Sequence, residues 1–432
     1  MKKLAEKYPV EFVQRTSRRV EFESVFACRM CCASTLRLVM SLGHQALTGV
    51  FPRTVTERVT VGPLELVLCE SCGLLQLRHN YNPEDLYGMN YGYRSGLNGS
   101  MVQHLNQKVL QLEAQFGVRS GDVVLDIGSN DSTLLRSYLT DGLTRIGMDP
   151  SGEKFRGFYP ADITLVSEIF TAGSFFEASG NRRAKLITSI AMFYDLQNPL
   201  EFVRDIAAAL ADDGLWHFEQ SYLPSMIEAT AYDTICHEHL EYYGLKQVKW
   251  MLDRCDLVAV DVETNSVNGG SFAVTAAKKN GKWATNVAPS VQQLLQGEET
   301  LGLQQAEGLL EFEQKTVNHR QDLVRLIRSL KEQGKRVLGY GASTKGNVIL
   351  QYCGFSIHDI SCIAEVNADK FGSFTPGTGI PIVSEAEARA MNPDYFLVLP
   401  WHFRDSIIER EESFLASGGK LIFPLPEIQI VG

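Results

Sequence analysis

The chain has 432 residues, of which 44% are hydrophobic, a size that suits two or three domains better than a single core. Its 41 Lys and Arg residues against 51 Asp and Glu residues give a net charge of -10, which disfavours a nucleic-acid partner because phosphate backbones bind basic surfaces. No run of about 18 apolar residues occurs and Met1 is not followed by a signal-peptide core, so we expect no membrane span and a cytoplasmic location.

Residues 1–92 predict a small, loop-rich domain with a metal site. Two C-x-x-C motifs, Cys28 to Cys31 and Cys69 to Cys72, are separated in the chain by about forty residues. Four thiolates from two such motifs complete a tetrahedral zinc site without an open position, so the zinc would be structural. The spacing favours Cys31 over its neighbour Cys32. Two unrelated cysteine pairs, or a redox pair, are the alternatives.

Residues 93–300 alternate apolar runs with helical patterns, which is typical of a doubly wound α/β fold with a parallel sheet. The predicted strands are 123–127, 144–148, 163–166, 186–190 and 214–219, with two further candidates at 257–263 and 270–277. The predicted helices are 101–116, 132–138 and 199–210, with another helical stretch around 237–243.

The turn after the first of these strands is the predicted cofactor site. It contains Asp126, Gly128, Ser129 and Asn130, and its glycine would let the backbone approach a ligand closely. A dinucleotide would need three glycines at G-x-G-x-x-G spacing, whereas S-adenosylmethionine has no phosphate and needs fewer. Asp149 ends the next strand, where a carboxylate can accept hydrogen bonds from both ribose hydroxyls.

His237, Glu238 and His239 form a second candidate site. The two histidines are two positions apart and cannot share a helical face, so the segment is not a zinc-binding H-E-x-x-H motif. An imidazole beside a carboxylate suits proton abstraction. The segment follows strand 214–219, whose carboxyl end faces the expected crevice. A polar surface helix is the alternative.

Residues 301–432 predict a long helix at 303–333 and a second Rossmann-like lobe. Its predicted strands are 336–340, 360–365 and 395–399, with helices starting at Lys345 and Glu385. The turn 339–346 combines glycines, hydroxyl side chains and a lysine at a helix N-terminus, which suits a diphosphate. A structural turn between strand and helix is the alternative. Glu365 and Asn367 end the next strand and could contact a sugar or a base.

Several motifs occur in a defined order along nearly the whole chain: the cysteine pairs with 73–77, then 91–95, 126–134, 237–239, 269–271, 339–347 and 375–382. This set resembles the sugar C-methyltransferases that act on nucleotide-linked deoxy-keto-sugars. The resemblance implies a zinc-binding domain (1–92), a central Rossmann-like methyltransferase domain (93–300) and a C-terminal Rossmann-like domain that binds the nucleotide-sugar (301–432). It implies S-adenosylmethionine and structural zinc as cofactors.

The resemblance also assigns roles. His239 would remove the proton beside the sugar ketone, Glu238 would assist near the carbonyl, and Tyr91 or Tyr93 would lie by the enolate, with His237 nearby. The implied cofactor residues are Asp126, Gly128, Ser129, Asn130, Asp149, Pro150, Glu168 and Ile169, the last two near adenine. The implied substrate residues are Tyr340, Gly341, Ala342, Ser343, Lys345, Asn347, Glu365 and Lys370. We expect a monomer or a homodimer.

The chain departs from the family pattern at several positions. Ser132 replaces a usual glycine, and Cys236 stands where related proteins often carry a tyrosine, so a phenol is absent there. Thymidine diphosphate is the family's usual nucleotide, although guanosine or cytidine nucleotides would fit the same turn. An NAD(P)-dependent nucleotide-sugar oxidoreductase is the main alternative, disfavoured by the missing third glycine at Thr344. A zinc-ribbon RNA methyltransferase is disfavoured by the net charge.

Overall fold

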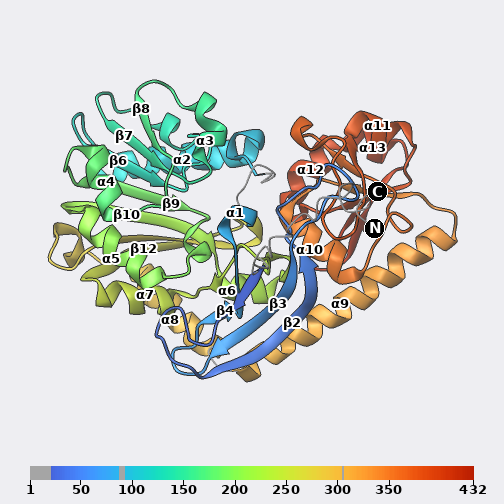
Figure 1. Cartoon of the computed structure of the whole chain (residues 1–432), viewed down its shortest axis with the longest axis horizontal. Coiled ribbons are helices and arrows are strands. Elements are labelled where there is room, and N and C mark those ends of the chain that lie inside the picture. The colour runs from blue at the N-terminus through green and yellow to red at the C-terminus, as the bar shows by residue number, and fades with distance from the viewer. Residues whose placement is uncertain (1–20, 87–92, 304–305) are drawn as a thin grey trace, which may run out of the picture.

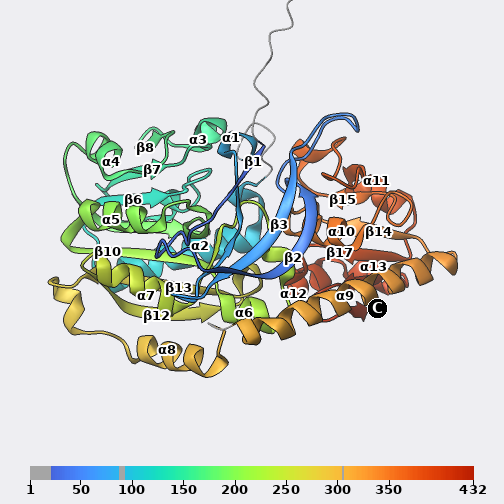
Figure 2. The same ribbon diagram turned by 60° about the horizontal axis from the view of Figure 1, so that its bottom comes forward.

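The computed structural model describes residues 21–86, 93–303 and 306–432. Figures 1 and 2 show two α/β lobes, with long N-terminal strands in blue lying between them. A long helix, α9 (Ala306–Glu332), connects the lobes and runs along the C-terminal one, close to the predicted 303–333. Within the described ranges, no helix combines the length and the apolar character needed to cross a bilayer.

The N-terminal part forms a four-stranded sheet in the order β11-β4-β3-β2. Pro63 of β3 lies opposite His44 at an irregularity in the pairing, a place where a sheet tolerates proline. The elements are β1 (Phe22–Ser24), β2 (Leu36–Ala46), β3 (Val61–Cys69), β4 (Leu75–Leu77), β5 (His79–Tyr81), α1 (Pro83–Leu86) and β11 (Glu241–Tyr242).

The central lobe contains a seven-stranded sheet in the order β12-β13-β10-β9-β6-β7-β8. Its strands are parallel except β13, which is antiparallel to both neighbours. The strand order reverses at β6, and ligands of such sheets bind at the carboxyl ends beside that point. The strands are β6 (Val123–Ile127), β7 (Thr144–Met148), β8 (Ile163–Val166), β9 (Ala184–Ile190), β10 (Leu210–Ser221), β12 (Leu257–Asn265) and β13 (Ser271–Lys278).

Helices cover the central sheet because each has one apolar face. In α2 the side chain of Asn98 accepts from the backbone N–H of Ser100 at the start, and Gly117 ends the helix with φ 62°. Its apolar stripe packs on the sheet through Met101, Leu105, Val109, Leu112 and Phe116. The helices are α2 (Gly99–Phe116), α3 (Gly152–Phe155), α4 (Ala172–Ser179), α5 (Pro199–Ala209), α6 (Leu223–Glu228), α7 (Leu245–Arg254) and α8 (Pro289–Leu301).

The C-terminal lobe has a six-stranded sheet in the order β16-β15-β14-β17-β18-β19, in which β19 alone is antiparallel. Its order reverses at β14, so a second ligand crevice is expected at the carboxyl ends of β14 and β17. The strands are β14 (Val337–Tyr340), β15 (Ile363–Glu365), β16 (Ile382–Ser384), β17 (Tyr395–Val398), β18 (Lys420–Phe423) and β19 (Gln429–Val431). The helices are α10 (Thr344–Cys353), α11 (Glu385–Ala390), α12 (Arg404–Arg410) and α13 (Glu412–Ala416).

Two predicted helices were wrong. In place of a helix over 132–138 the chain has only the short 3-10 turn η2 (Leu135–Ser137), because Ser132 adopts φ 62° and cannot continue a right-handed helix. The stretch around 237–243 is a turn followed by strand β11. Its backbone forms hydrogen bonds with distant segments instead of within a helix. Leu240 donates to the carbonyl of Tyr194 at 2.7 Å and accepts from the N–H of Leu77 at 2.8 Å.

Candidate active site

The N-terminal cysteines form a compact metal site. The sulfur atoms of Cys28, Cys31, Cys69 and Cys72 all lie within 4.8 Å of one another. The cluster contains Cys31 and excludes the neighbouring Cys32, which is exposed and has φ 62°. Four thiolates of this kind suit tetrahedral zinc and leave no position for a substrate. The site therefore holds the fold of the N-terminal part together.

The turn after β6 is shaped for close approach of a ligand. Gly128 has φ 74°, and a Cβ there would lie 3.1 Å from the side chain of Met192. Asn130 also has a positive φ, of 47°, and its N–H donates to Oδ2 of Asp149 at 2.8 Å. The other oxygen of Asp149 accepts from the N–H of Ser151 at 2.7 Å. One carboxylate thus holds the turn against the end of β7.

Two polar residues that the sequence did not identify support this turn. Thr188 of β9 donates to Oδ1 of Asp126 at 2.6 Å. Burial raises the pKa of Asp126 to about 7, and the Thr188 hydrogen bond lowers it. The hydroxyl of Tyr159 donates to the carbonyl of Asn130 at 2.9 Å and accepts from Ser129 at 2.8 Å. Neither Thr188 nor Tyr159 belongs to a sequence motif, so only the fold could reveal them.

The remaining predicted cofactor residues line the same edge of the sheet. Pro150 is exposed directly after Asp149. Glu168 and Ile169 follow β8, and Ile169 is 66% exposed. A turn with one glycine and a carboxylate at the end of β7 suit S-adenosylmethionine better than a dinucleotide. That these particular residues contact it stays a prediction.

His239 is held in one tautomer. Its Nδ1 lies 2.8 Å from the carbonyl oxygen of Thr234, which can only accept, so Nδ1 carries the proton and Nε2 keeps its lone pair. The ring of Tyr194 lies 4.2 Å from the imidazole, centroid to centroid. Burial and, after it, the charge of Lys345 lower the pKa of His239 to about 3. The imidazole is therefore neutral at physiological pH.

His237 and Glu238, the neighbours of His239, contact the N-terminal part of the chain. His237 is fully buried and its ring packs edge-on against Tyr81 at 4.6 Å, so it lies against the N-terminal strands. Glu238 is buried too, with Oε1 unpartnered among the described residues and a Cys236 thiol 3.8 Å from Oε2. A Cβ on Gly49 would lie 2.1 Å from Oε1, which explains the glycine. Burial raises the pKa of Glu238 to about 7.

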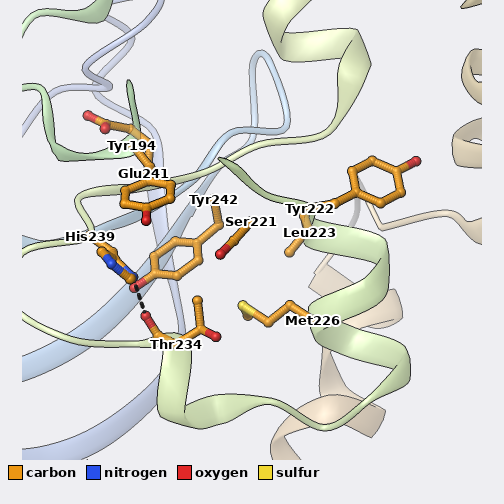
Figure 3. Close-up of a pocket in the computed structure, with 9 residues that line it drawn as sticks. All are labelled: Tyr194, Ser221, Tyr222, Leu223, Met226, Thr234, His239, Glu241 and Tyr242. Carbon is orange, nitrogen blue, oxygen red and sulfur yellow. Dashed lines mark hydrogen bonds between the residues drawn. The ribbon is translucent and has the colours of Figure 1, made fainter. Parts of the chain in front are cut away.

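A narrow pocket lies beside His239, too tight to admit a water molecule. Figure 3 shows the rings of Tyr194 and Tyr242 turned toward the imidazole of His239. The hydroxyl of Tyr242 is buried and has no hydrogen-bond partner among the described residues. The pocket is smaller than typical ligand pockets, which start at about 300 Å³. It is lined by Tyr194, Ser221, Tyr222, Leu223, Met226, Thr234, His239, Glu241 and Tyr242.

The aromatic segment before α2 lies on the cofactor turn. The N–H of Ser95 donates to Oδ1 of Asn130 at 2.9 Å, and the N–H of Gly96 donates to Asp131 at 3.0 Å. Tyr93, two residues earlier, is 45% exposed. Tyr91 lies outside the described residues. The structure thus places Tyr93 close to the turn that the sequence assigned to the cofactor.

The second predicted turn, after β14, repeats the arrangement of the first. Gly341 has φ 81°, and a Cβ there would lie 2.7 Å from Pro400. The N–H of Ala342 donates to Oε2 of Glu365 at 2.8 Å. Ser343 starts α10 and accepts from the N–H of Gly346 at 3.0 Å. Lys345 donates to the carbonyl of Asn268 at 2.7 Å and so connects this lobe to the central one.

Two predicted substrate residues are turned to internal partners. The hydroxyl of Tyr340 donates to Glu411 at 2.9 Å inside the C-terminal lobe. The amide of Asn347 is fully buried and donates to the carbonyl of Thr48 at 2.7 Å. Their side chains therefore join parts of the protein, and their role as substrate residues stays a prediction.

Lys370 lies where three parts of the chain meet. It donates to the carbonyl of Ala342 at 2.7 Å and sits over the ring of Phe51 at 4.4 Å. Burial lowers the pKa of Lys370, Glu365 raises it and the charge of Lys154 lowers it. Lys154, on α3 of the central lobe, is in turn within electrostatic range of Arg53. Cations from the N-terminal, central and C-terminal parts thus face one region.

Three family models match successive parts of the chain. Residues 28–87 match a zinc-binding domain family, residues 100–262 a methyltransferase domain family and residues 266–426 the family described as the C-methyltransferase C-terminal domain. The C-methyltransferase NovU of Streptomyces niveus is 32% identical over 407 residues, which cover 94% of this chain and 96% of NovU.

Solved structures resemble parts of the chain more distantly. The N-methyltransferase NodS of Bradyrhizobium japonicum WM9 is 12% identical, with a TM-score of 0.31. The match covers 42% of this chain and 98% of the NodS chain. The CcbJ methyltransferase of Streptomyces caelestis is 10% identical, with a TM-score of 0.30. The match covers 40% of this chain and 89% of the CcbJ chain. Because these likenesses are weak, the family assignment rests on the matched family models and on NovU. The chain belongs to the family of S-adenosylmethionine-dependent C-methyltransferases that carry an N-terminal zinc-binding domain.

Proposed function

We propose that this C-methyltransferase acts on the carbon beside the ketone of a deoxy-keto-sugar linked to a nucleoside diphosphate. The observation that carries the proposal is the hydrogen bond from Nδ1 of His239 to Thr234, which leaves the Nε2 lone pair available as a base. A carbon acid next to a ketone needs a neutral, oriented base of this kind. His239 also lies at the carboxyl edge of the central sheet, where the cofactor turn is.

The chemistry assigned to the protein is formation of an enolate. Nε2 of His239 takes the proton from carbon, and the electron pair of that C–H bond moves toward the carbonyl oxygen. Negative charge on the enolate then raises the pKa of the neighbouring imidazolium by ion pairing, which offsets the effect of burial. Glu238, with a pKa raised by burial to about 7, retains a protonated fraction near neutral pH that can donate to the developing oxyanion.

Phenols near His239 support the same step. Tyr194 is in ring contact with His239, and Tyr93 lies by the cofactor turn. They supply the hydroxyl donors that Cys236, a buried thiol, cannot supply at its own position. When bound, S-adenosylmethionine supplies an electrophilic methyl group. Its proposed binding residues are Asp126, Gly128, Ser129, Asn130, Asp149, Pro150, Glu168 and Ile169.

The nucleotide is proposed to bind the C-terminal lobe. A diphosphate carries charges that suit the turn after β14, where Ser343 opens α10 and Lys345 and Lys370 lie on the same side of the sheet. Lys154 of the central lobe approaches Lys370, and Arg53 of the N-terminal part approaches Lys154. This arrangement would hold the diphosphate between the lobes and direct the sugar toward His239.

A second candidate function rests on the strand order of the C-terminal sheet. Numbered along the chain, that order is 3-2-1-4-5-6, which is the order of dinucleotide-binding folds. Glu365 also ends the second strand, where such folds place a ribose-binding acid. Both of its oxygens, however, accept backbone N–H groups, at 2.7 to 2.8 Å. Asp149 accepts backbone N–H groups with both oxygens in the same way, so this pattern does not separate the two ligands. The missing third glycine, at Thr344, is what favours the nucleotide-sugar over NAD(P).

The test is a transfer assay with methyl-labelled S-adenosylmethionine and a panel of nucleotide-linked 4-keto-sugars. We expect transfer to at least one panel member and no transfer to the corresponding 4-hydroxy sugars, which lack the acidic C–H. Calorimetry with NAD and NADP, expected to show no binding, separates the alternative. Cofactor binding without transfer to any keto-sugar would refute the sugar substrate.

A further inference from the structure

A short turn of the central lobe is held in place by side chains of the C-terminal lobe. This turn, η5 (Tyr232–Thr234), contains Asp233, which is completely buried. Oδ2 of Asp233 accepts a hydrogen bond from the indole N–H of Trp401 at 2.7 Å, and Trp401 belongs to η9 (Trp401–Phe403) of the C-terminal lobe. Oδ1 has no hydrogen-bond partner among the described residues. The one side-chain hydrogen bond that this buried carboxylate accepts within the described chain therefore comes from the other lobe.

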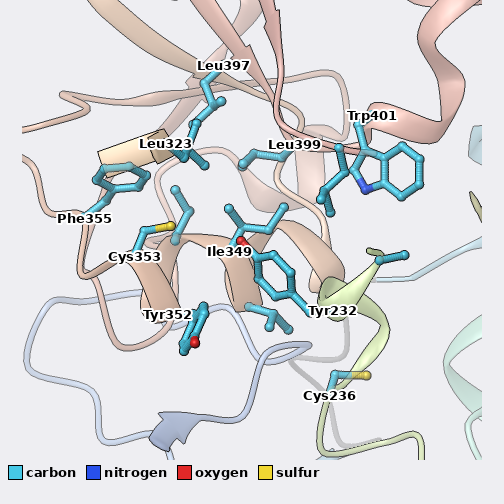
Figure 4. Close-up of a cluster of buried hydrophobic side chains, with 14 of the residues drawn as sticks. Tyr232, Cys236, Leu323, Ile349, Tyr352, Cys353, Phe355, Leu397, Leu399 and Trp401 are labelled. Atoms are coloured by element: carbon cyan, nitrogen blue, oxygen red, sulfur yellow. The ribbon is translucent and has the colours of Figure 1, made fainter. Parts of the chain in front are cut away.

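Tyr232, the residue before Asp233, is also held by contacts with the C-terminal lobe. The hydroxyl of Tyr232 donates to Nδ1 of His319 on α9 at 3.1 Å, and Nε2 of His319 donates to the carbonyl of Pro424 at 2.5 Å. The ring of Tyr232 also packs edge-on against Tyr352 of α10, at 5.4 Å. Figure 4 shows Tyr232 projecting from the central lobe into the apolar side chains of the C-terminal lobe, beside Ile349 and Leu399.

The residue after Asp233 orients the proposed base. The carbonyl of Thr234 accepts the proton of His239 Nδ1 at 2.8 Å, so the position of η5 determines both the tautomer and the direction of the ring. A backbone carbonyl moves with its turn. Any shift of Asp233 relative to Trp401 is therefore passed to the imidazole through one residue.

We propose that Trp401 and Asp233 are positioning residues for catalysis, through which the C-terminal lobe aligns His239. The inference rests on the proposed role of His239 as the base. Its consequence is that the C-terminal lobe is part of the catalytic apparatus as well as a binding domain. Displacement of a reacting group by about 1 Å can cost on the order of 100-fold in rate, so a single hydrogen bond at this point matters.

The charges around the turn agree with a link between substrate binding and alignment. Lys345 starts in the turn proposed to hold the diphosphate, and its Nζ donates to the carbonyl of Asn268 in the central lobe. Its charge acts on both Asp233 and His239. His402, next to Trp401, is half-buried, and desolvation together with the charge of Lys345 lowers its pKa to about 3, so it is neutral. A ligand that binds Lys345 would therefore change the electrostatic environment of η5.

The test compares two Trp→Phe variants. Trp401→Phe keeps an aromatic ring and removes the N–H donor to Asp233. Trp283→Phe is the matched control, because Trp283 donates to the carbonyl of Asp213 at 3.1 Å at the opposite edge of the central sheet. We expect Trp401→Phe to lower kcat on the order of tenfold, as for loss of a hydrogen bond to a buried charge, with the Kd for S-adenosylhomocysteine within about twofold of wild type. Trp283→Phe should change neither.

A second readout does not depend on turnover. In the ¹⁵N-histidine NMR spectrum, with His239 assigned from the His239→Gln variant, the wild type should show a proton on Nδ1, and Trp401→Phe should shift this resonance toward a mixture of tautomers. Asp233→Asn, which keeps an acceptor for Trp401, should retain more activity than Asp233→Ala. An unchanged His239 resonance and unchanged kcat in Trp401→Phe would overturn the proposal. If the His239 resonance behaved as expected in the wild type and in Trp401→Phe, but the wild type transferred no methyl group to any keto-sugar, the proposed function would be refuted instead.

Discussion

At the scale of single residues, the two lobes use the same device. In each, the carboxylate that ends or follows the second strand accepts the N–H of the turn after the first strand: Asp149 from Asn130 and Glu365 from Ala342, both at 2.8 Å. A charged acceptor makes such a hydrogen bond strong and sets the turn before any ligand arrives. The acids that sequence spacing assigned to sugar contacts therefore also shape their turns.

This double role of Asp149 predicts a loss of cofactor affinity on substitution. Asp149→Ala should weaken binding of S-adenosylhomocysteine at least about tenfold, because it removes a carboxylate and releases the turn at Asn130. Isothermal titration calorimetry measures this. Asp162→Ala is the control, since Asp162 is an exposed acid that pairs with Arg145 at the far end of the same strand pair. Equal affinities of Asp149→Ala and the wild type would contradict the assigned site.

Glu238 predicts a pH-dependent stability difference. Burial raises its folded-state pKa to about 7, above the ordinary value of 4.5, so the stability that its neutral form provides is complete below pH 4.5 and lost as pH rises through 7. Glu238→Gln cannot ionise and should escape that loss. We expect the variant to be more stable than the wild type by about 3 kcal/mol at pH 8.5 relative to their difference at pH 4, since each pKa unit is worth about 1.4 kcal/mol.

Urea denaturation at the two pH values measures this difference. Gln has the size and shape of Glu, so packing against Gly49 is retained and the pH dependence isolates the charge. A stability difference that is the same at both pH values would show that Glu238 titrates normally in the folded protein.

Sequence reasoning identified residues that belong to motifs and missed those that only the fold brings together. The choice of Cys31 over Cys32 followed from spacing, and the cluster contains Cys31. Thr234, Tyr194 and Asp233 were missed, because each acts through a backbone carbonyl, a ring contact or a bond to the other lobe. Tyr340 and Asn347 were assigned to the ligand because they lie in a motif, although their side chains point to protein partners.

At the scale of elements, strands were predicted more closely than turns. The predicted 123–127, 144–148 and 163–166 coincide with β6, β7 and β8, because buried parallel strands are short apolar runs bounded by polar residues. The helix expected at 132–138 failed at a residue with positive φ, which composition does not reveal. The stretch around 237–243 failed because β11 pairs with β4, a contact across more than 160 residues.

The zinc element yields a prediction that separates two adjacent cysteines. Cys72→Ser should lose bound zinc, as measured by metal analysis of the purified protein, and should unfold at a lower temperature because the turns at Cys28 and Cys69 lose their common centre. Cys32→Ser, one position from the cluster, should keep one zinc per chain and the wild-type melting temperature. Loss of zinc from Cys32→Ser would mean that the ligand set is wrong.

At the scale of the whole molecule, the N-terminal strands hold the two lobes in register. Gln351 of α10 exchanges two hydrogen bonds with the backbone of Ala46, at 2.7 and 3.1 Å, and Gln247 of α7 donates to the carbonyl of Gly73 at 3.0 Å. Strand β11 of the central segment completes the N-terminal sheet. We propose domain boundaries after residues 92 and 300, with the zinc-binding domain as the connector that sets the spacing between the two lobes.

The order of the three parts was predictable from the sequence, and their docking was not. Composition and periodicity report what each segment buries locally, whereas Trp401, Asn347 and Gln351 reveal their partners only when the lobes meet. This is why the sequence could place a cofactor turn and a phosphate turn in separate lobes and still miss the turn η5 that lies between them and carries Thr234.

The most direct test of the account follows the methyl group to its destination. The wild type and His239→Gln are incubated with S-adenosylmethionine carrying a ¹³C-labelled methyl group and the nucleotide-linked keto-sugar found in the panel, and the product is examined by NMR. The account predicts a methyl group bonded to the ring carbon beside the former ketone with the wild type, and no product with His239→Gln despite normal cofactor binding. A methyl group on oxygen, or full activity of His239→Gln, would contradict it.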